Sequence, residues 1–171
     1  MLSRVLRTMM GAVTELLAFC SDLPTQTVSA GEVLIESGDL IPRMYVLASG
    51  AVTIEKDGVA FARIDTRGAI FGEMSVVLGQ PASATVRASS DVTVHVVAEP
   101  EAFLTEQPGA ALAVLRMTAS RLDGLTRYLV DVKQQFADRE GHLGMVDQIL
   151  DTLVHHQASP VRTGSARDPE G

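Results

Sequence analysis

Cysteine is nearly absent from this sequence, since Cys20 is the single cysteine among 171 residues. No disulfide can therefore form within the chain, and a reducing compartment is the expected environment. Cys20 stands among apolar residues, where an unpaired cysteine is usually a small buried hydrophobic side chain rather than a nucleophile. We expect Cys20 to be part of a core.

Positive charge is also scarce. The chain has 14 lysine and arginine residues against 21 aspartate and glutamate residues, which gives a net charge of -7. A protein that wraps nucleic acid needs a basic face, and electrostatic docking on a membrane needs a basic patch. The composition argues against both partners. Apolar residues make up 46% of the chain, so a sizeable core can form.

No hydrophobic run is long enough to cross a bilayer. The best candidate, residues 9–20, follows Arg4 and Arg7 and so loosely resembles a signal peptide. Glu15 interrupts the run, no small-residue cleavage site follows it, and a spanning helix needs roughly 20 apolar residues. We therefore expect an amphipathic helix that packs on the domain, in a cytoplasmic protein with no membrane partner.

The motifs of common enzymes are missing as well. The chain contains neither a Gly-x-Ser-x-Gly nucleophile elbow nor a Walker loop. His95 is the only histidine of the β-rich region, whereas a cupin-type metal site needs paired histidines and a glutamate. His155 and His156 are adjacent and would point about 100° apart on a helix. We expect no enzymatic activity, no metal site and no cofactor.

Sequence periodicity predicts the main helices and strands. Apolar residues recur at helical spacing over residues 3–19, and Pro108-Gly109 opens a second helical pattern. Short β-branched runs between them predict strands over residues 33–35, 43–48, 51–55, 59–64, 84–89 and 92–98. Asp57-Gly58 predicts a hairpin between its two flanking strands, because these residues tolerate a positive φ. We expect the last two strands to pair with each other around Ser90-Asp91.

Many short strands without long helices between them are typical of an antiparallel β-barrel or jelly roll. The predicted fold class is therefore mainly β, with flanking helices. The predicted order is an N-terminal helix over 1–27, a barrel over 28–100, a long C-terminal helix over 101–140, a short helix over 141–157 and a disordered tail over 158–171.

The long C-terminal helix has an apolar seam. Its two rows of residues recur every seven positions and lie three positions apart, a period typical of a coiled coil. The seam predicts a homodimer, although the same face could instead pack on the chain's own barrel. The candidate interface consists of Leu115, Leu122, Leu125, Leu129, Val132 and Phe136.

Two stretches of the barrel region resemble the cyclic nucleotide-binding domain family, which includes catabolite activators and the regulatory subunits of protein kinase A. The first stretch contains the turns at Ser37-Gly38-Asp39 and Ser49-Gly50. The second runs from Gly68 to Val86 and resembles the phosphate-binding cassette of that family. The resemblance covers residues 28–100 and implies a signal sensor whose ligand is cAMP or cGMP.

The resemblance also implies which residues contact the ligand. Gly72 would let the backbone approach it, and a helical turn starting near Glu73 would direct N–H groups at an anion. In the family, the glutamate at the position of Glu73 accepts a hydrogen bond from a sugar hydroxyl, although Glu73 could instead cap backbone N–H groups of the following turn. Thr126 of the long helix could contact the base, or it could be a solvated helix residue. The candidate ligand-binding residues are Phe71, Gly72, Glu73, Met74, Ser75, Ala82, Ser83, Ala84, Thr85 and Thr126.

Ala82 departs from the family pattern. Family members have an arginine at this position, directly after the residue matching Pro81, and it pairs with the cyclic phosphate. Losing one partner of such a buried pair costs about 2–5 kcal/mol. Arg87 is close in sequence, but we do not expect it to substitute.

Two hypotheses about function follow. In the first, the chain is a standalone regulatory sensor of cAMP or cGMP that signals through its C-terminal helices to a downstream protein. In the second, it is a degenerate member of the fold that acts as a dimerisation or protein-docking module. Family members that bind DNA carry a reading domain after the long helix, and the roughly thirty residues that follow here are too few for one.

Overall fold

The computed structural model describes residues 2–135 and residue 149, with side chains described over 11–134 and at 149. The chain divides into two compact units, Met1–Ser120 and Arg121–Gly171. The first unit contains every strand of the described chain. The predicted short helix over 141–157 and the predicted tail over 158–171 lie outside the described residues, apart from residue 149, which is helical.

The described chain has four helices. They are α1 (Leu2–Phe19), α2 (Glu73–Leu78), α3 (Pro100–Glu106) and α4 (Pro108–Gln135). The sequence predicted α1, the short helix at Glu73 and the start of α4 at Pro108, and the structure confirms all three. Proline is well suited to the first position of α3 and α4, because that position needs no N–H donor. Gln107 separates the two helices.

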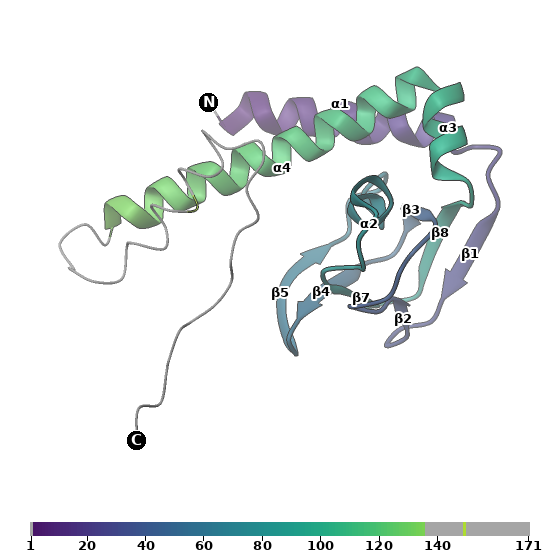
Figure 1. Cartoon of the computed structure of the whole chain (residues 1–171), viewed down its shortest axis with the longest axis horizontal. Coiled ribbons are helices and arrows are strands. Elements are labelled where there is room, and N and C mark those ends of the chain that lie inside the picture. The colour runs from purple at the N-terminus through teal and green to yellow at the C-terminus, as the bar shows by residue number, and fades with distance from the viewer. Residues whose placement is uncertain (1, 136–148, 150–171) are drawn as a thin grey trace. The chain divides into compact units, whose positions relative to one another are not determined.

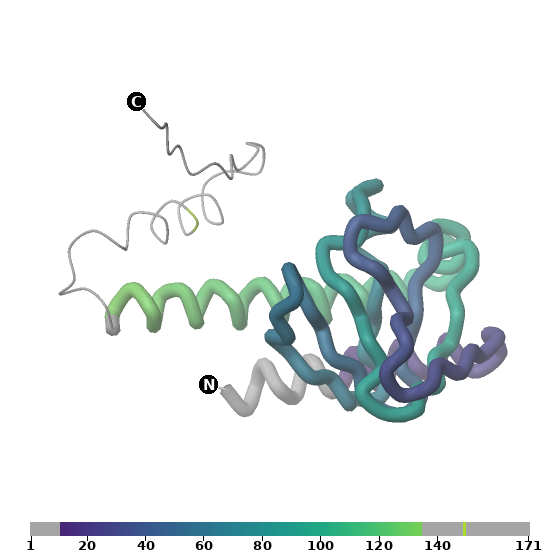
Figure 2. The backbone as a smooth tube through the Cα atoms, turned by 90° about the horizontal axis from the view of Figure 1, so that it is seen from below, coloured from purple at the N-terminus to yellow at the C-terminus, as the bar shows by residue number. Residues whose placement is uncertain are grey.

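The strands form two antiparallel four-stranded sheets that curl into a barrel (Figures 1 and 2). One sheet has the order β1-β8-β3-β6 and the other has the order β2-β7-β4-β5. This is the predicted jelly-roll class. The strands are β1 (Thr25–Val28), β2 (Val33–Ile35), β3 (Met44–Ser49), β4 (Val52–Lys56), β5 (Val59–Ile64), β6 (Ile70–Phe71), β7 (Thr85–Ala88) and β8 (Val92–Val97).

The hairpin predicted at Asp57-Gly58 is present. Strands β4 and β5 pair antiparallel on either side of it, with Lys56 opposite Val59. Asp57 has φ 51° and Gly58 has φ 77°, the two successive positive values that a type I′ turn requires. The structure therefore confirms the local turn chemistry.

The predicted pairing of the last two strands with each other is wrong. Strand β7 pairs with β2 and β4, whereas β8 pairs with β1 and β3 in the other sheet. The turn between them is held by the β3–β4 turn, because the N–H groups of Ser89 and Ser90 both donate to the Ala51 carbonyl, at 2.8 and 3.3 Å. The chain therefore crosses from one sheet to the other at Ser90-Asp91 instead of folding back on itself.

Strand β3 is buried on both faces. Tyr45 and Leu47 point into the barrel, and Met44 and Val46 point outward beneath the helices. Since side chains alternate along a strand, β3 contributes to two separate cores. The barrel core contains Val28, Ile35, Tyr45, Leu47, Val52, Ala69, Phe71, Val86, Ala88, Val92 and Val94.

The second core lies between the barrel and a layer of two helices. Helix α4 supplies Ala110, Ala113, Val114 and Met117, whose spacing of three and four residues places them on one face. Helix α1 and the residue that follows it supply Ala12, Val13, Leu16 and Cys20. Cys20 is fully buried, as predicted from the sequence, and its burial raises the pKa of the thiol to about 11. Outside this core, Arg116 of α4 forms an ion pair with Glu15 of α1 at 2.8 Å.

Gly68 is a point of close contact between α1 and the barrel. It has φ 85°, and a Cβ atom placed there would collide with the carbonyl oxygen of Val13 in α1. Its N–H donates to the Leu47 carbonyl of β3 at 2.8 Å. Only glycine combines this backbone conformation with this separation, so Gly68 sets how closely α1 packs on the barrel.

We predict that Gly68→Ala destabilises the protein by more than the cost of its positive φ alone. Gly31→Ala is the matched control, because Gly31 has φ 89° and nothing within 4 Å of the added methyl group. The control should lose about 1–2 kcal/mol of unfolding free energy in a urea titration. The loss at Gly68 should be at least about 1 kcal/mol larger, since overpacking adds about 1–3 kcal/mol. Equal losses would show that α1 does not depend on this contact.

Candidate functional site

The cassette begins where β6 ends at Phe71 and the chain turns sharply into α2. Gly72 makes this turn, with φ 85° and ψ -8°. A Cβ atom at this position would lie 2.8 Å from the Arg43 carbonyl oxygen. The glycine is therefore required both by its backbone conformation and by the close approach of the segment that leads into β3.

The first residues of the cassette alternate between buried and exposed positions. Phe71 is buried in the barrel core, and Glu73 is only 5% exposed. Met74 points outward, with 53% of its surface exposed. A carboxylate is rarely buried without a partner group or a function. Glu73, for which the family resemblance implies a hydrogen bond with a sugar hydroxyl, is enclosed at the start of α2.

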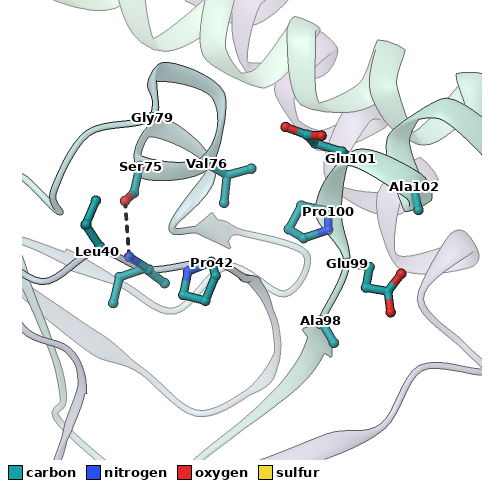
Figure 3. Close-up of a pocket in the computed structure, with 11 residues that line it drawn as sticks. Leu40, Pro42, Ser75, Val76, Gly79, Ala98, Glu99, Pro100, Glu101 and Ala102 are labelled. Atoms are coloured by element: carbon teal, nitrogen blue, oxygen red, sulfur yellow. Dashed lines mark hydrogen bonds between the residues drawn. The ribbon is translucent and has the colours of Figure 1, made fainter.

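Ser75 connects α2 to the loop between β2 and β3. Its hydroxyl donates to the Gln80 carbonyl at 2.5 Å and accepts from the Ile41 N–H at 3.4 Å (Figure 3). Both roles of the hydroxyl are satisfied within the protein. Ser75 thus bonds α2 to Gln80, just beyond the end of the helix, and to the β2–β3 loop.

Ala82 and Thr85 bind the same loop from the other end of the cassette. The Ala82 N–H donates to the Asp39 carbonyl and the Ala82 carbonyl accepts from the Gly38 N–H, each at 2.8 Å. The Thr85 hydroxyl accepts from the Ser37 N–H at 3.1 Å and donates to the Glu36 carboxylate at 3.2 Å. The methyl group of Ala82 packs against the barrel core.

Residues 36–41, which we name the tie loop, therefore hold both ends of the cassette. The Ser37-Gly38-Asp39 turn was predicted only as part of the family pattern. Its role in holding the two ends of the cassette was not predicted. No local pattern signalled this function, because the side-chain bonds of the tie loop join residues 34 to 49 positions apart. Because the Ser75 and Thr85 hydroxyls are used by the tie loop, Ser83 and Ala84 are left as the candidate donors to a ligand. In the described chain, their N–H groups form no hydrogen bond with another residue.

Arg87 lies on β7 but is held on the outside of the barrel. Its guanidinium donates to the Glu55 carboxylate at 3.2 and 3.3 Å and to the Gly31 carbonyl at 3.0 Å. Val86, the preceding residue, points into the barrel core, so Arg87 points the opposite way. These contacts support the expectation that Arg87 does not replace the missing cassette arginine.

Thr126 belongs to the second unit of the chain. Its hydroxyl donates to the Leu122 carbonyl one helical turn earlier, at 2.9 Å. This bond is the usual one for a threonine within a helix. No observation tests whether Thr126 also contacts a ligand.

The seam of α4 exposes large apolar side chains. Leu115 is 64%, Leu122 48% and Leu125 50% exposed, whereas Leu129 and Val132 are half-buried. The sixth candidate, Phe136, lies outside the described residues. Dimerisation itself stays a prediction.

No group of three or more histidine, cysteine, aspartate or glutamate side chains in the described chain could hold a metal ion. No described helix is both long enough and apolar enough to span a membrane.

An open pocket of about 720 Å³ lies beside the cassette, on the outer side of α2 (Figure 3). It is lined by Leu40 and Ile41 of the tie loop with the following Pro42, by one side of α2 with the following Gly79, and by residues 98–102 around the start of α3. Of the predicted ligand-binding residues, only Ser75 lines this pocket.

The β-rich region of the chain matches a known protein family. Residues 25–105 match the family described as cyclic nucleotide-binding domain. The match spans all eight strands and α2, and it includes most of α3.

Curated relatives share part of the chain. Two uncharacterized ABC transporter ATP-binding proteins of Mycobacterium tuberculosis are each 38% identical, over 73 and 76 residues. The alignments cover 40% and 41% of this chain but only 22% and 23% of those proteins. The chain therefore spans less than a quarter of the length of these relatives.

Solved structures share the fold. The catabolite activator protein of Thermus thermophilus superposes with a TM-score of 0.60 at 23% identity, over 70% of this chain and 59% of that one. A structure described under a cyclic-GMP-dependent signalling pathway in bacterial phytopathogenesis superposes with a TM-score of 0.54 at 22% identity, over 63% of this chain and 91% of that one.

We predict that Thr85→Val loosens the tie loop. Valine keeps the shape of the side chain but leaves the partly buried Ser37 N–H without its acceptor, which costs about 1–3 kcal/mol. Thr93→Val on β8 is the matched control, because the Thr93 hydroxyl forms no hydrogen bond within the described chain. Urea unfolding and amide exchange at Ser37 measure the effect. Equal stability of the two variants would contradict the structural role of Thr85.

Proposed function

Because residues 25–105 belong to the cyclic nucleotide-binding domain family, we propose that this chain is a regulatory sensor of a small nucleotide. The proposed ligand is cAMP or cGMP, and the proposed signal passes through the C-terminal helices to a downstream protein. The sensor itself performs no chemistry. The single buried cysteine and the acidic composition fit a cytoplasmic location.

The observation that carries this proposal is the construction of the cassette. Gly72 and the enclosed Glu73 form one side, while Ser83 and Ala84 offer donors on the other. The tie loop binds both sides through Ser75, Ala82 and Thr85. Segments that are held together in this way can be preorganised for a sugar and a phosphate.

The proposed route of the signal follows β3. This strand contacts the barrel core through one face and the helical core through the other. A ligand that moves α2 or the tie loop changes the packing of the barrel core, and β3 transfers that change to α1 and the start of α4. Coupling of this kind is reciprocal, so a partner that binds the helices would also change the affinity for the ligand.

A second candidate function is a docking or dimerisation module that has lost its ligand. Ala82 favours it, because a small methyl group packed on the core stands where family members place the phosphate-binding arginine. Arg87 is held by Glu55 and the Gly31 carbonyl. An anion would therefore lack the charged partner that contributes most to its binding.

Calorimetric titration of cAMP and cGMP into the unmodified chain and Ala82→Arg separates the two functions. We predict that Ala82→Arg raises the affinity by about 30-fold to several thousand-fold, the range that corresponds to about 2–5 kcal/mol for a buried charge pair. Pro81→Arg is the matched control, since it adds the same charge at the neighbouring exposed position. It should raise the affinity only slightly.

Each result has a definite meaning. Tight binding by the unmodified chain removes the second candidate. Failure of Ala82→Arg to bind either nucleotide means that the pocket is closed, and the sensor proposal then fails. An equal gain from Pro81→Arg would show that charge, and not the cassette position, limits binding.

We also propose that the chain forms a homodimer through the seam of α4. The exposed leucines of the seam are the support, because contiguous exposed apolar side chains on a helix usually pair with a partner. Leu122→Glu should convert a dimer to a monomer in sedimentation experiments. Val130→Glu is the matched control, since it changes an exposed apolar residue of the same helix outside the seam. A monomeric unmodified chain, or an unchanged mass of Leu122→Glu, would rule out the proposed seam.

A further inference from the structure

The pocket beside α2 has a composition that the nucleotide proposal does not use. Its walls are apolar: Leu40, Ile41 and Pro42 lie on one side, Val76 of α2 on a second and Pro100 of α3 on a third. The Ser75 hydroxyl in its wall is already bonded to Ile41 and Gln80. A ligand in this pocket would therefore contact mostly carbon atoms.

One charged group is directed at this apolar space. Figure 3 shows the Glu101 carboxylate extending from α3 toward α2, whereas the Glu99 carboxylate points away from α2. Within the described chain, the Glu101 carboxylate forms no ion pair or hydrogen bond. No lysine or arginine lines the pocket. The chemical complement of these walls is a group that joins a cation to an apolar body.

The surface around the pocket extends the apolar area. Leu40 at its edge is 71% exposed, and Val77 and Leu78 on α2 are 66% and 57% exposed. A free small molecule would fill the pocket and leave this area in water. A polypeptide segment could cover both, because one side chain would enter the pocket while its neighbours cover the apolar edge.

We propose that this pocket is a docking site for a protein partner that presents a basic residue flanked by apolar residues. The basic side chain lies along the apolar walls with its charge at Glu101, as lysine and arginine do when their carbon stems are buried. The net charge of -7 attracts basic partners and raises their association rate.

Occupation of this site would be linked to the cassette. Leu40 and Ile41 end the tie loop, Val76 belongs to α2, and Gly79 directly follows that helix. A partner that contacts both segments would alter the spacing that the Ser75–Ile41 hydrogen bond sets. This linkage rests on the proposed function, whereas the docking itself does not.

Nuclear magnetic resonance on the full ¹⁵N-labelled chain without nucleotide tests the docking. The probes are two blocked tripeptides, leucine-arginine-leucine and leucine-glutamate-leucine, and butylguanidine as a small cation. We expect the basic peptide to shift amide signals of residues 40–41, 75–79, 98–99 and 101–102 at millimolar concentration or below. The acidic peptide should leave these signals unchanged. Butylguanidine should bind at least about tenfold more weakly, since it lacks the flanking apolar contacts.

Three variants sharpen the test. Glu101→Gln should weaken binding of the basic peptide by about three- to fivefold, as expected for a solvent-accessible ion pair. Glu106→Gln, on the same helix but outside the pocket, is the matched control and should not change it. Ala102→Phe fills the pocket from an exposed position and should abolish the shifts while the remaining spectrum stays that of the folded chain.

Four outcomes would overturn the docking proposal: no shifts, shifts outside the pocket, equal binding of the acidic peptide, or equal binding of butylguanidine. The linkage is read separately, by repeating the peptide titration on Ala82→Arg saturated with cAMP. A changed peptide affinity supports the linkage, and an unchanged one rejects it. If Ala82→Arg binds no nucleotide, the sensor proposal has failed, and the docking result still stands.

Discussion

The structure depends on the burial of β3 on both faces. Met44 and Val46 are fully enclosed under the helices, and Tyr45 and Leu47 are enclosed inside the barrel. A strand of this kind cannot shift by one residue without exchanging the side chains of its two cores, so its register is firmly set. The burial of β3 on both faces also means that the helical layer and the barrel are not packed independently of each other. Under the proposed function, β3 is the route by which a packing change inside the barrel reaches residues that contact the helices.

In the cassette, residues that were predicted to bind a ligand also hold the structure together. Thr85 and Ser75 carry hydroxyls suited to a phosphate, yet both are bonded to the tie loop. Under the proposed function, the remaining candidate contacts with a ligand are backbone N–H groups and the Glu73 carboxylate. This division explains why the loss of one arginine at Ala82 need not disturb the fold. The Ala82 backbone is held by Gly38 and Asp39, whatever side chain it carries.

Local chemistry made much of this fold predictable. Helical spacing identified α1, the Asp57-Gly58 pair identified its hairpin, and the spacing of glycines identified the barrel family. Strand β1 was missed because Thr25, Gln26 and Thr27 are exposed and polar, and their pairing with β8 depends on the neighbouring strand rather than on their own pattern. The β7–β8 error has the same origin, since the turn between them would suit a hairpin and only the contact with Ala51 directs it elsewhere. The tie loop joins residues about fifty positions apart, and no local pattern encodes such bonds.

The position of Cys20 gives the protein a built-in reporter. It is the chain's single thiol, it is fully enclosed between the helices and the barrel, and its pKa near 11 keeps it protonated and unreactive. A thiol reagent can reach it only when the helical layer opens. The rate of its modification therefore reports how readily that layer opens, without any introduced label. A ligand or partner that tightens or loosens the layer would change this rate even if the average structure stayed the same.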